Sequence, residues 1–173
     1  MNLTVVARIV NSCDVMMGIH GAGLTNLVFL PSNAVLIQII PLGGIKWWCD
    51  HYFGEPVADM DIRYFAYMIR EEESTLIQQY PLDHVAFKDP SSFYKQGWMA
   101  LKAVYLGKQN VKLDVRRFRA TLLKALELLR PTNPFLFPLA NCHDANPIRN
   151  GEIDTNYMCS LLLSTGKPDK EKA

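Results

Sequence analysis

A short glycine-rich run, HGAGLTN at residues 20–26, combines a histidine and two glycines with the polar side chains of Thr25 and Asn26. An apolar, strand-like stretch precedes it, and a stretch that can form a helix follows it. A strand that turns through glycines into a helix leaves backbone N–H groups unpaired, and the positive end of the helix dipole adds to them. Because glycine has no side chain, a ligand can approach this backbone closely. The run therefore predicts a site for a bound phosphate.

Three familiar motifs nearly fit this run, but the chain lacks an essential element of each. Leu24 stands where a Walker A motif needs its phosphate-binding lysine. Asn26 stands where a dinucleotide fingerprint needs its third glycine, and no acidic residue lies about twenty positions further on. The lipase oxyanion loop is excluded because no Gly-x-Ser-x-Gly motif follows. A phosphate-binding loop of another kind remains, beside the alternative of a tight turn that binds nothing.

An ordered set of motifs around this run resembles glycosyltransferase family 61, particularly the plant branch that decorates xylan with xylose or arabinose. The resemblance covers roughly residues 5–129, and its most specific part is the HGAGLTN run. The segments that carry it are VNSCDVM at 10–16, GIHGAGLTN at 18–26, VFLP at 28–31, AVLIQIIP at 34–41, FGEP at 53–56, EESTL at 72–76, DP at 89–90, QNV at 109–111 and the stretch 114–129. Single residues that also match are Met60, Tyr64, Tyr67 and Trp98.

The resemblance implies a fold, a reaction and a location. The fold would be α/β, with a Rossmann-like parallel sheet and flanking helices, as the C-terminal donor-binding half of a GT-B type glycosyltransferase. The reaction would be inverting transfer of a pentose, such as xylose or arabinose, from a UDP-sugar to xylan or another polysaccharide or glycoprotein acceptor. Family members are type II membrane proteins, which implies the Golgi lumen.

Compared with such family members the chain looks truncated, and we expect it to be inactive alone. Two alternatives remain open, namely a non-catalytic nucleotide-binding fragment and a structural remnant without a ligand. We expect the first ten residues to be neither a signal peptide nor a membrane span, because they contain Arg8 and only short apolar stretches.

Candidate site residues fall in three places. The donor diphosphate is expected to contact His20, Gly21, Ala22, Gly23, Leu24, Thr25 and Asn26. Backbone N–H groups in this run would stabilise the departing diphosphate, and His20 would donate to a phosphate oxygen, more strongly as a cation. Glu73, with Ser74 beside it, is predicted to hold the donor ribose, although a glutamate run is also typical of a solvated helix end. Glu55 is predicted to face the donor sugar or to cap a helix. No residue is assigned as the general base, and without an Asp-x-Asp motif no metal site is predicted.

Composition narrows the remaining classes. With 173 residues, of which 49% are hydrophobic, the chain can bury a core. The net charge of +1 argues against nucleic acid or an anionic membrane as a partner. Four widely spaced cysteines without a Cys-x-x-Cys pair argue against zinc, and we interpret them as buried thiols, with a disulfide left open. Asn2 begins an Asn-Leu-Thr glycosylation sequon.

Local patterns predict alternating strands and helices, and therefore a parallel sheet. Strands are expected at 14–19, 34–40 and 63–69, and helices at 3–12, 24–30, 55–61 and 90–106, with an irregular aromatic segment at 45–53. The clearest helix is 115–129, with Asp114 as its N-cap and Pro131 ending it. Its expected apolar stripe is Val115, Phe118, Leu122, Ala125, Leu126 and Leu129. Its cations, Arg116, Arg117, Arg119 and Lys124, are expected to face solvent.

These patterns divide the chain into two parts. Residues 1–130 are expected to form the donor-binding region. Residues 131–173 are expected to form a divergent tail, rich in proline at first and then charged, and partly disordered.

Overall fold

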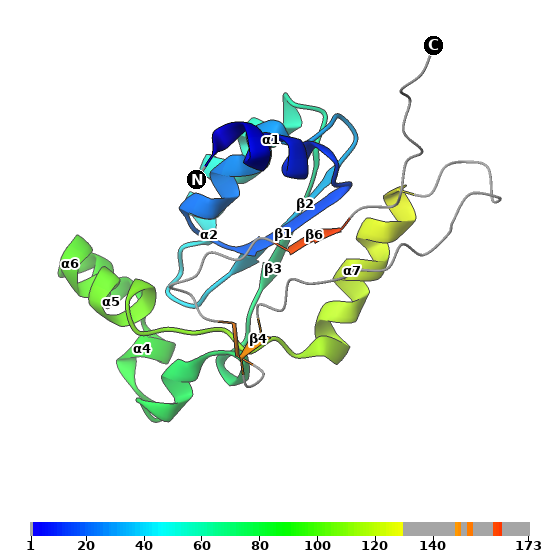
Figure 1. The fold of residues 1–173 in the computed structure, drawn as a ribbon. Coiled ribbons are helices and arrows are strands. Elements are labelled where there is room, and N and C mark those ends of the chain that lie inside the picture. Colours follow the sequence, from blue (N-terminus) through cyan, green and yellow to red (C-terminus); the bar gives the residue numbers. More distant parts are fainter. Residues whose placement is uncertain (1, 130–147, 150–151, 154–160, 164–173) are drawn as a thin grey trace, which may run out of the picture.

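The computed structural model describes residues 2–129, 148–149, 152–153 and 161–163 (Figure 1). Its sheet contains three parallel strands in the order β3-β2-β1, with a short strand antiparallel to β1 at the other edge. These strands are β1 (Val15–Ile19), β2 (Val35–Ile40), β3 (Arg63–Met68) and β6 (Leu161–Leu163). A separate two-stranded pair joins β4 (Ile148–Arg149) and β5 (Glu152–Ile153). The order of the parallel strands is that of one half of a Rossmann sheet. The predicted α/β fold with a Rossmann-like parallel sheet is confirmed at this level.

Helices cover both faces of the sheet (Figure 1). Every residue of β2 is buried, as its apolar, β-branched sequence predicts for a central parallel strand. One face packs Leu36 against α1 (Leu3–Asn11) and the 3-10 helix η1 (Ala22–Phe29). The other face packs Ile37 and Ile39 against α7 (Val115–Leu129).

A third apolar cluster lies beyond the carboxyl ends of β2 and β3. It joins Ile40 and Leu76 to a group of short helices that extends away from the sheet. The elements in this part of the chain are the 3-10 helices η3 (Glu71–Glu73) and η4 (Thr75–Gln78), the helices α4 (Val85–Lys88), α5 (Ser91–Lys95) and α6 (Trp98–Leu101), and the π-helix η5 (Lys102–Leu106).

Most predicted elements are confirmed, with four corrections. The segment after the glycines is a 3-10 helix, whose side chains bond back to nearby carbonyls. The prediction of an irregular segment at 45–53 is wrong. These residues are helical, because α2 (Lys46–Cys49) runs into the π-helix η2 (Asp50–Gly54) and then α3 (Glu55–Ala58). No glycine or proline interrupts these residues before position 54, and Cys49 and Phe53 bury one side. The helix predicted at 90–106 is interrupted at Gly97, which has φ +96°.

The fourth correction concerns α7. Asp114 is its N-cap, as predicted, because one carboxylate oxygen accepts from the N–H groups of Arg116 at 2.9 Å and Arg117 at 3.2 Å. Phe118 and Ala125 are buried, but Val115 is 75% exposed and does not belong to the apolar stripe. The predicted end at Pro131 lies outside the described residues, and so does most of the tail predicted at 131–173, of which the structure describes only 148–149, 152–153 and 161–163.

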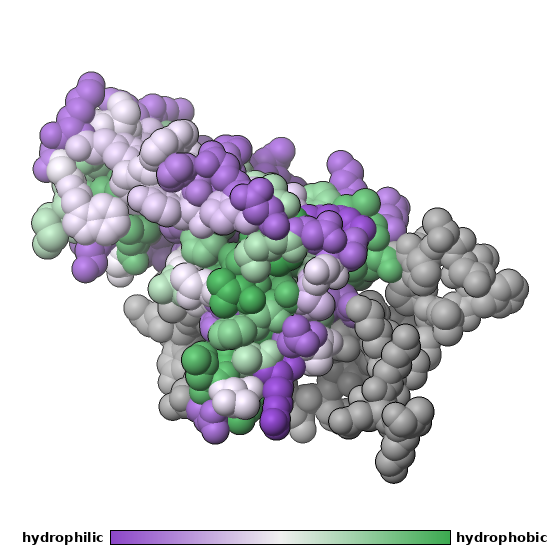
Figure 2. Space-filling view, turned by 90° about the horizontal axis from the view of Figure 1, so that it is seen from above, coloured by the Kyte–Doolittle hydropathy of each residue, from purple (hydrophilic) through white to green (hydrophobic). Residues whose placement is uncertain are grey.

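An apolar patch remains uncovered on the side of the sheet that carries α1. Leu3, Val5 and Ile9 of α1 and Val28 of η1 are each at least half exposed. Figure 2, seen from above Figure 1, shows hydrophobic residues gathered on this side. Contiguous exposed apolar surface of this kind is typical of a contact surface.

The turn after β2 supplies a stability prediction. Gly43 has φ +119°, and a Cβ there would lie 2.7 Å from Cγ of the buried Tyr105. Gly43→Ala should therefore lower the free energy of unfolding by about 2–3 kcal/mol, from backbone strain and overpacking together. Gly97→Ala is the matched control, because φ is +96° but no atom lies within 4 Å. It should cost only about 1 kcal/mol in urea unfolding. Equal losses for the two variants would contradict the role given to Tyr105.

Candidate donor-binding site

The glycine run lies at the carboxyl edge of the parallel sheet, immediately after β1. His20 continues the strand, since its N–H donates to the Ile39 carbonyl of β2 at 2.9 Å. The first turn of η1 then closes with the Leu24 N–H donating to the Gly21 carbonyl at 3.1 Å. Ligands of open α/β sheets bind beyond this edge. The structure thus places the predicted phosphate loop where a ligand site is expected, with a helix start directly behind it.

Side chains from within the loop hold its backbone. Thr25 Oγ1 donates to the Ala22 carbonyl at 2.6 Å, and Asn26 Nδ2 donates to the Gly23 carbonyl at 3.0 Å. Leu24 is 1% exposed and anchors the loop in the core. Because Thr25 and Asn26 donate to carbonyl groups of the loop, they stabilise its conformation. Backbone N–H groups then remain as the donors to a bound anion. Both side chains thus bond back to carbonyl groups three residues earlier in the chain.

His20 is oriented by a polar pair that the sequence did not reveal as part of the site. The Gln38 side-chain amide donates to His20 Nδ1 at 2.7 Å, and the Tyr64 hydroxyl donates to the Gln38 side-chain carbonyl at 2.6 Å. Gln38 is fully buried on β2. With Nδ1 accepting, the neutral ring carries its proton on Nε2, which becomes the donor available to a ligand.

The hydrogen bonds that run from Tyr64 through Gln38 to His20 form what we call the His20 relay. Burial sets the protonation states of its two titratable members, His20 and Tyr64. It lowers the pKa of His20 below its ordinary value, so the ring is neutral at pH 7. Burial also raises the pKa of Tyr64, and the nearby Asp50 carboxylate raises it further. Tyr64 therefore remains a protonated donor. A neutral Nε2–H replaces the cationic donor considered from the sequence.

The His20 relay gives a pH prediction. A histidine whose folded pKa lies below its unfolded value adds stability that is fully present above the unfolded pKa, about 6.5, and is lost as pH falls through that value toward the folded pKa. Nitrogen-detected NMR of the imidazole should show the Nε2–H tautomer and a midpoint below 6.5. Gln38→Leu should remove the tautomer preference, and Gln79→Leu, at an exposed glutamine, should not. A His20 midpoint at or above 6.5 would contradict the assignment.

The helical segment after β2 supports the same relay from outside. Phe53 meets the His20 ring edge to face, with centroids 5.5 Å apart. Asp50 accepts a longer hydrogen bond, 3.4 Å, from Tyr64 and forms an ion pair with Lys46. A Cβ on Gly54 would lie 2.9 Å from the Tyr64 ring, so the helix can approach the strand here only with glycine.

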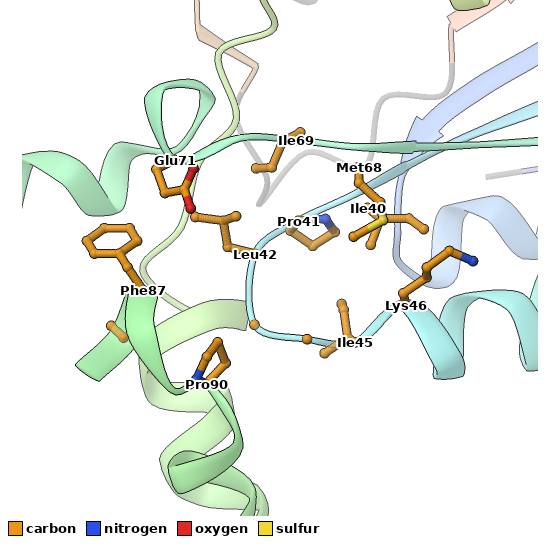
Figure 3. A pocket seen from close by; sticks show the side chains of 13 residues that line it. Ile40, Pro41, Leu42, Ile45, Lys46, Met68, Ile69, Glu71, Phe87 and Pro90 are labelled. Atoms are coloured by element: carbon orange, nitrogen blue, oxygen red, sulfur yellow. The ribbon is translucent and has the colours of Figure 1, made fainter. Parts of the chain in front are cut away.

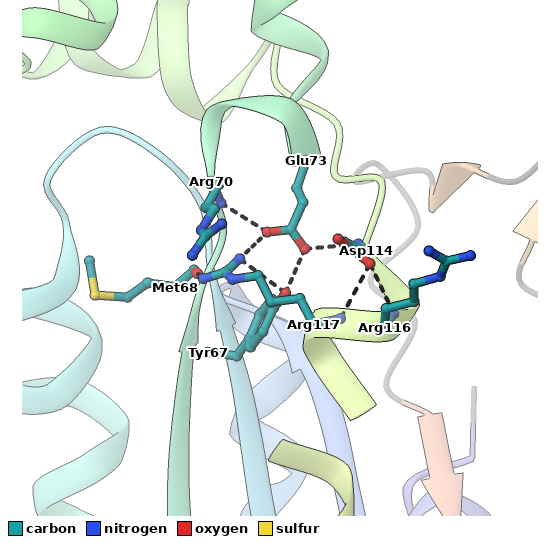
Figure 4. Close-up of polar contacts among 7 residues, drawn as sticks. All are labelled: Tyr67, Met68, Arg70, Glu73, Asp114, Arg116 and Arg117. Carbon is teal, nitrogen blue, oxygen red and sulfur yellow. Dashed lines mark hydrogen bonds and ion pairs between the residues drawn. The ribbon is translucent and has the colours of Figure 1, made fainter. Parts of the chain in front are cut away.

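Glu73 lies in a different polar cluster, between the end of β3 and the start of α7 (Figure 4). One carboxylate oxygen accepts from the Tyr67 hydroxyl at 2.6 Å and the Asp114 N–H at 2.8 Å. The other accepts from the Arg70 N–H at 2.9 Å and pairs with the Arg117 guanidinium. Four donors saturate a carboxylate. A ribose would have to displace one of them, so the predicted ribose role of Glu73 stays a prediction and the observed role is structural.

Arg117 corrects an interpretation made from the sequence. Its guanidinium turns inward to Glu73, donates to the Met68 carbonyl at 2.5 Å and lies 4.6 Å from the centre of the Tyr67 ring. It therefore joins α7 to β3, whereas Arg116 and Arg119 are exposed as expected. Helical periodicity places Arg117 off the apolar stripe, but a buried carboxylate on another element outweighs solvation.

The remaining predicted site residues lie apart from the loop. Ser74 is buried, and its hydroxyl accepts from the Leu76 N–H at 3.2 Å, which caps η4. Glu55 is exposed and pairs with His51 at 2.9 Å on the helical segment that carries Phe53. Asn2 is exposed and caps α1 by accepting from the Thr4 N–H at 3.0 Å. Its glycosylation, like the donor-sugar role of Glu55, stays a prediction.

Cys13 and Cys49 are buried free thiols, as interpreted, and burial raises the pKa of Cys49 to about 12. Cys142 and Cys159 lie outside the described residues. Within the part of the chain that the structure describes, no three histidine, cysteine or acidic side chains gather as a metal site. Over the same residues, no helix combines the length and apolar character needed to cross a bilayer.

A parallel α/β sheet with a glycine loop at its carboxyl edge is the architecture of Rossmann-like ligand-binding domains. Comparison with known proteins narrows this class, although no protein-family model matches the chain. An alpha-1,3-arabinosyltransferase of Oryza sativa subsp. japonica (XAT3) is 54% identical over 125 residues, which are 72% of this chain and 22% of that protein. A beta-1,2-xylosyltransferase of the same organism (XYXT1) is 53% identical over 129 residues, 75% of this chain and 28% of that protein. A xylan glycosyltransferase of Arabidopsis thaliana (MUCI21) is 41% identical over 123 residues, 71% of this chain and 25% of that protein.

The predicted resemblance to the plant xylan arabinosyl- and xylosyltransferases of family 61 is thereby confirmed over the matched segment. The chain spans about a quarter of the length of these relatives. An arabinosyltransferase and a xylosyltransferase match it almost equally well, so overall identity does not select the donor sugar.

Proposed function

We propose that this chain carries the donor-binding portion of an inverting glycosyltransferase that uses a UDP-sugar. The transferred sugar would be a pentose, xylose or arabinose, and the acceptor xylan or a related glycan. This proposal takes its reaction from the named activities of the relatives. It further assigns the sheet to the C-terminal half of a GT-B enzyme in the Golgi lumen.

One observation carries the proposal from the relatives to this chain. The HGAGLTN loop starts η1 at the carboxyl edge of the sheet, and His20 is held there by Gln38 and Tyr64. Departure of a nucleoside diphosphate builds negative charge on the phosphate oxygens. Backbone N–H groups from Gly21 to Gly23 and the Nε2–H of His20 would stabilise that charge without rearranging during the reaction.

The general base that deprotonates the acceptor hydroxyl is not among the residues assigned here. This chain would therefore bind the donor. The complete reaction would need residues from the part of such an enzyme that the chain does not match. A non-catalytic nucleotide-binding fragment shares the first part of this account and differs only in turnover.

Calorimetric titration of the purified chain with UDP, UMP and inorganic pyrophosphate tests the proposal. UDP should bind more tightly than UMP, because the second phosphate adds charge-assisted hydrogen bonds to the loop. Equal affinities for UDP and UMP would contradict a diphosphate site at the loop, and no binding of any of the three by a demonstrably folded chain would argue for a ligand-free structural remnant. A transfer assay with UDP-xylose or UDP-arabinose and xylan then separates an enzyme from a binding fragment.

A further inference from the structure

We propose that a pocket at the carboxyl ends of β2 and β3 binds the pyrimidine base of the donor nucleotide, with Glu71 and Phe87 as its specificity-determining residues. This inference rests on the proposed function and extends it from the diphosphate to the nucleoside. The pocket is enclosed by the turn Pro41–Ile45, the end of β3 and the first residues of α4 (Figure 3).

The position of the pocket suits a nucleotide whose diphosphate lies on the glycine loop. The loop follows β1, and the pocket opens where the neighbouring strands β2 and β3 end. Adjacent strands lie about 4.8 Å apart, so the ends of β1 and β2, from which the loop and the pocket turn begin, are about this far apart. The ribose of a nucleoside diphosphate bridges such a separation. Ile39, which accepts the His20 N–H, directly precedes Ile40 in the pocket wall.

The size and the lining of the pocket favour one small planar ring. Its volume is about 110 Å³, well below the roughly 300 Å³ or more of sites that enclose a whole drug-sized ligand. Most of the wall is apolar, from residues such as Leu42, Ile45 and Ile69, and Phe87 is its aromatic member. Base–aromatic stacking binds nucleobases through this kind of contact. A pyrimidine presents one ring to such a pocket, whereas a purine presents two.

Glu71 supplies the polar contact that a base or its ribose requires. Figure 3 shows its carboxylate and the Phe87 ring on one side of the pocket and Lys46 on the other. Among the described residues, the Glu71 side chain has no hydrogen-bond or ion-pair partner, in contrast to Glu73, which has four donors. A carboxylate in this place accepts from the N3–H of uracil or from a ribose hydroxyl.

The turn that forms the pocket floor is held by contacts from two tyrosines. Gly43 and Gly44 both have positive φ, +119° and +70°, which glycine adopts readily. The Tyr94 hydroxyl donates to the Gly43 carbonyl at 2.9 Å, and Tyr105 packs against the same glycine. A floor held in this way lowers the entropy lost when a ring binds.

Calorimetry on the whole chain with UDP, ADP and inorganic pyrophosphate tests the inference. The wild type should prefer UDP to ADP by about tenfold, the value of one lost stacking contact. Glu71→Gln and Phe87→Leu should each weaken UDP about five- to tenfold and leave pyrophosphate affinity unchanged. The matched controls are Glu72→Gln, an exposed neighbour outside the pocket, and Phe93→Leu, in the same apolar cluster but not in the pocket wall. Both should bind UDP as the wild type does.

Wild-type UDP affinity in the two pocket variants would overturn the inference and leave the proposed function standing. Failure of the folded wild type to bind either UDP or pyrophosphate would instead overturn the proposed function, and the pocket assignment with it. Glu71→Gln removes only a charge from a half-buried side chain, so the test does not depend on Phe87→Leu folding.

Discussion

Replacing Glu73 with alanine should lower the free energy of unfolding by about 3 kcal/mol. The substitution leaves the Arg117 guanidinium, the Tyr67 hydroxyl and the Asp114 N–H without their shared acceptor, and breaking one partner of a buried pair is costly. Urea unfolding measures the loss. Glu72→Ala is the control, because that side chain is exposed, and it should change stability by less than about 0.5 kcal/mol. Equal effects of the two alanines would contradict the structural role given to Glu73.

The Glu73 cluster should make the free energy of unfolding depend on pH in the acidic range. Burial by itself would raise the pKa of Glu73, but hydrogen bonds from Tyr67 and the backbone of Arg70 and Asp114, with the charge of Arg117, hold that pKa below its ordinary value. A carboxylate with a depressed folded pKa adds stability that is present above the unfolded pKa and is lost as pH falls through the folded pKa. The wild type should therefore lose more stability below about pH 4.5 than Glu73→Gln does.

Gly23→Val should weaken UDP binding by at least about 100-fold. A branched side chain at this position would cover the N–H groups that meet the diphosphate and displace the loop backbone from the phosphate oxygens. Losing two hydrogen bonds to a charged group costs about 3–6 kcal/mol, which exceeds a 100-fold change in affinity. Calorimetry gives the affinity, and circular dichroism shows whether the variant is folded.

Ala22→Gly is the control for Gly23→Val, because it removes a methyl group from the same loop without covering any N–H group. It should bind UDP within about threefold of the wild type. Wild-type affinity in a folded Gly23→Val protein would place the diphosphate elsewhere.

Much of the fold follows from local patterns. The strands at 34–40 and 63–69 and the helix at 115–129 were predictable because their periodicity and caps agree with their tertiary roles. The segment 45–53 was not, because its helix is stabilised by burying Cys49 and Phe53 and not by a regular stripe. Its π-helical turn has no signal that hydropathy alone carries.

The site was predictable at the loop and less so around it. The glycine run could be recognised from its composition. The partner of His20 could not, because Gln38 lies eighteen residues away on the neighbouring strand. Gln38 did leave a signal, as the polar residue within the apolar run 34–40. Arg117 left none, because its partner Glu73 is brought near only by the crossing of α7 over β3. Among three consecutive glutamates, the sequence could not distinguish the saturated Glu73 from Glu71, which has no side-chain partner among the described residues.

The most direct test of the donor-binding account is an amide NMR titration of the chain with UDP. The account predicts that the largest shift changes fall on the N–H groups of Gly21, Ala22 and Gly23, with the His20 Nε2–H changing in parallel. Saturable UDP binding that leaves these four signals unchanged would contradict it.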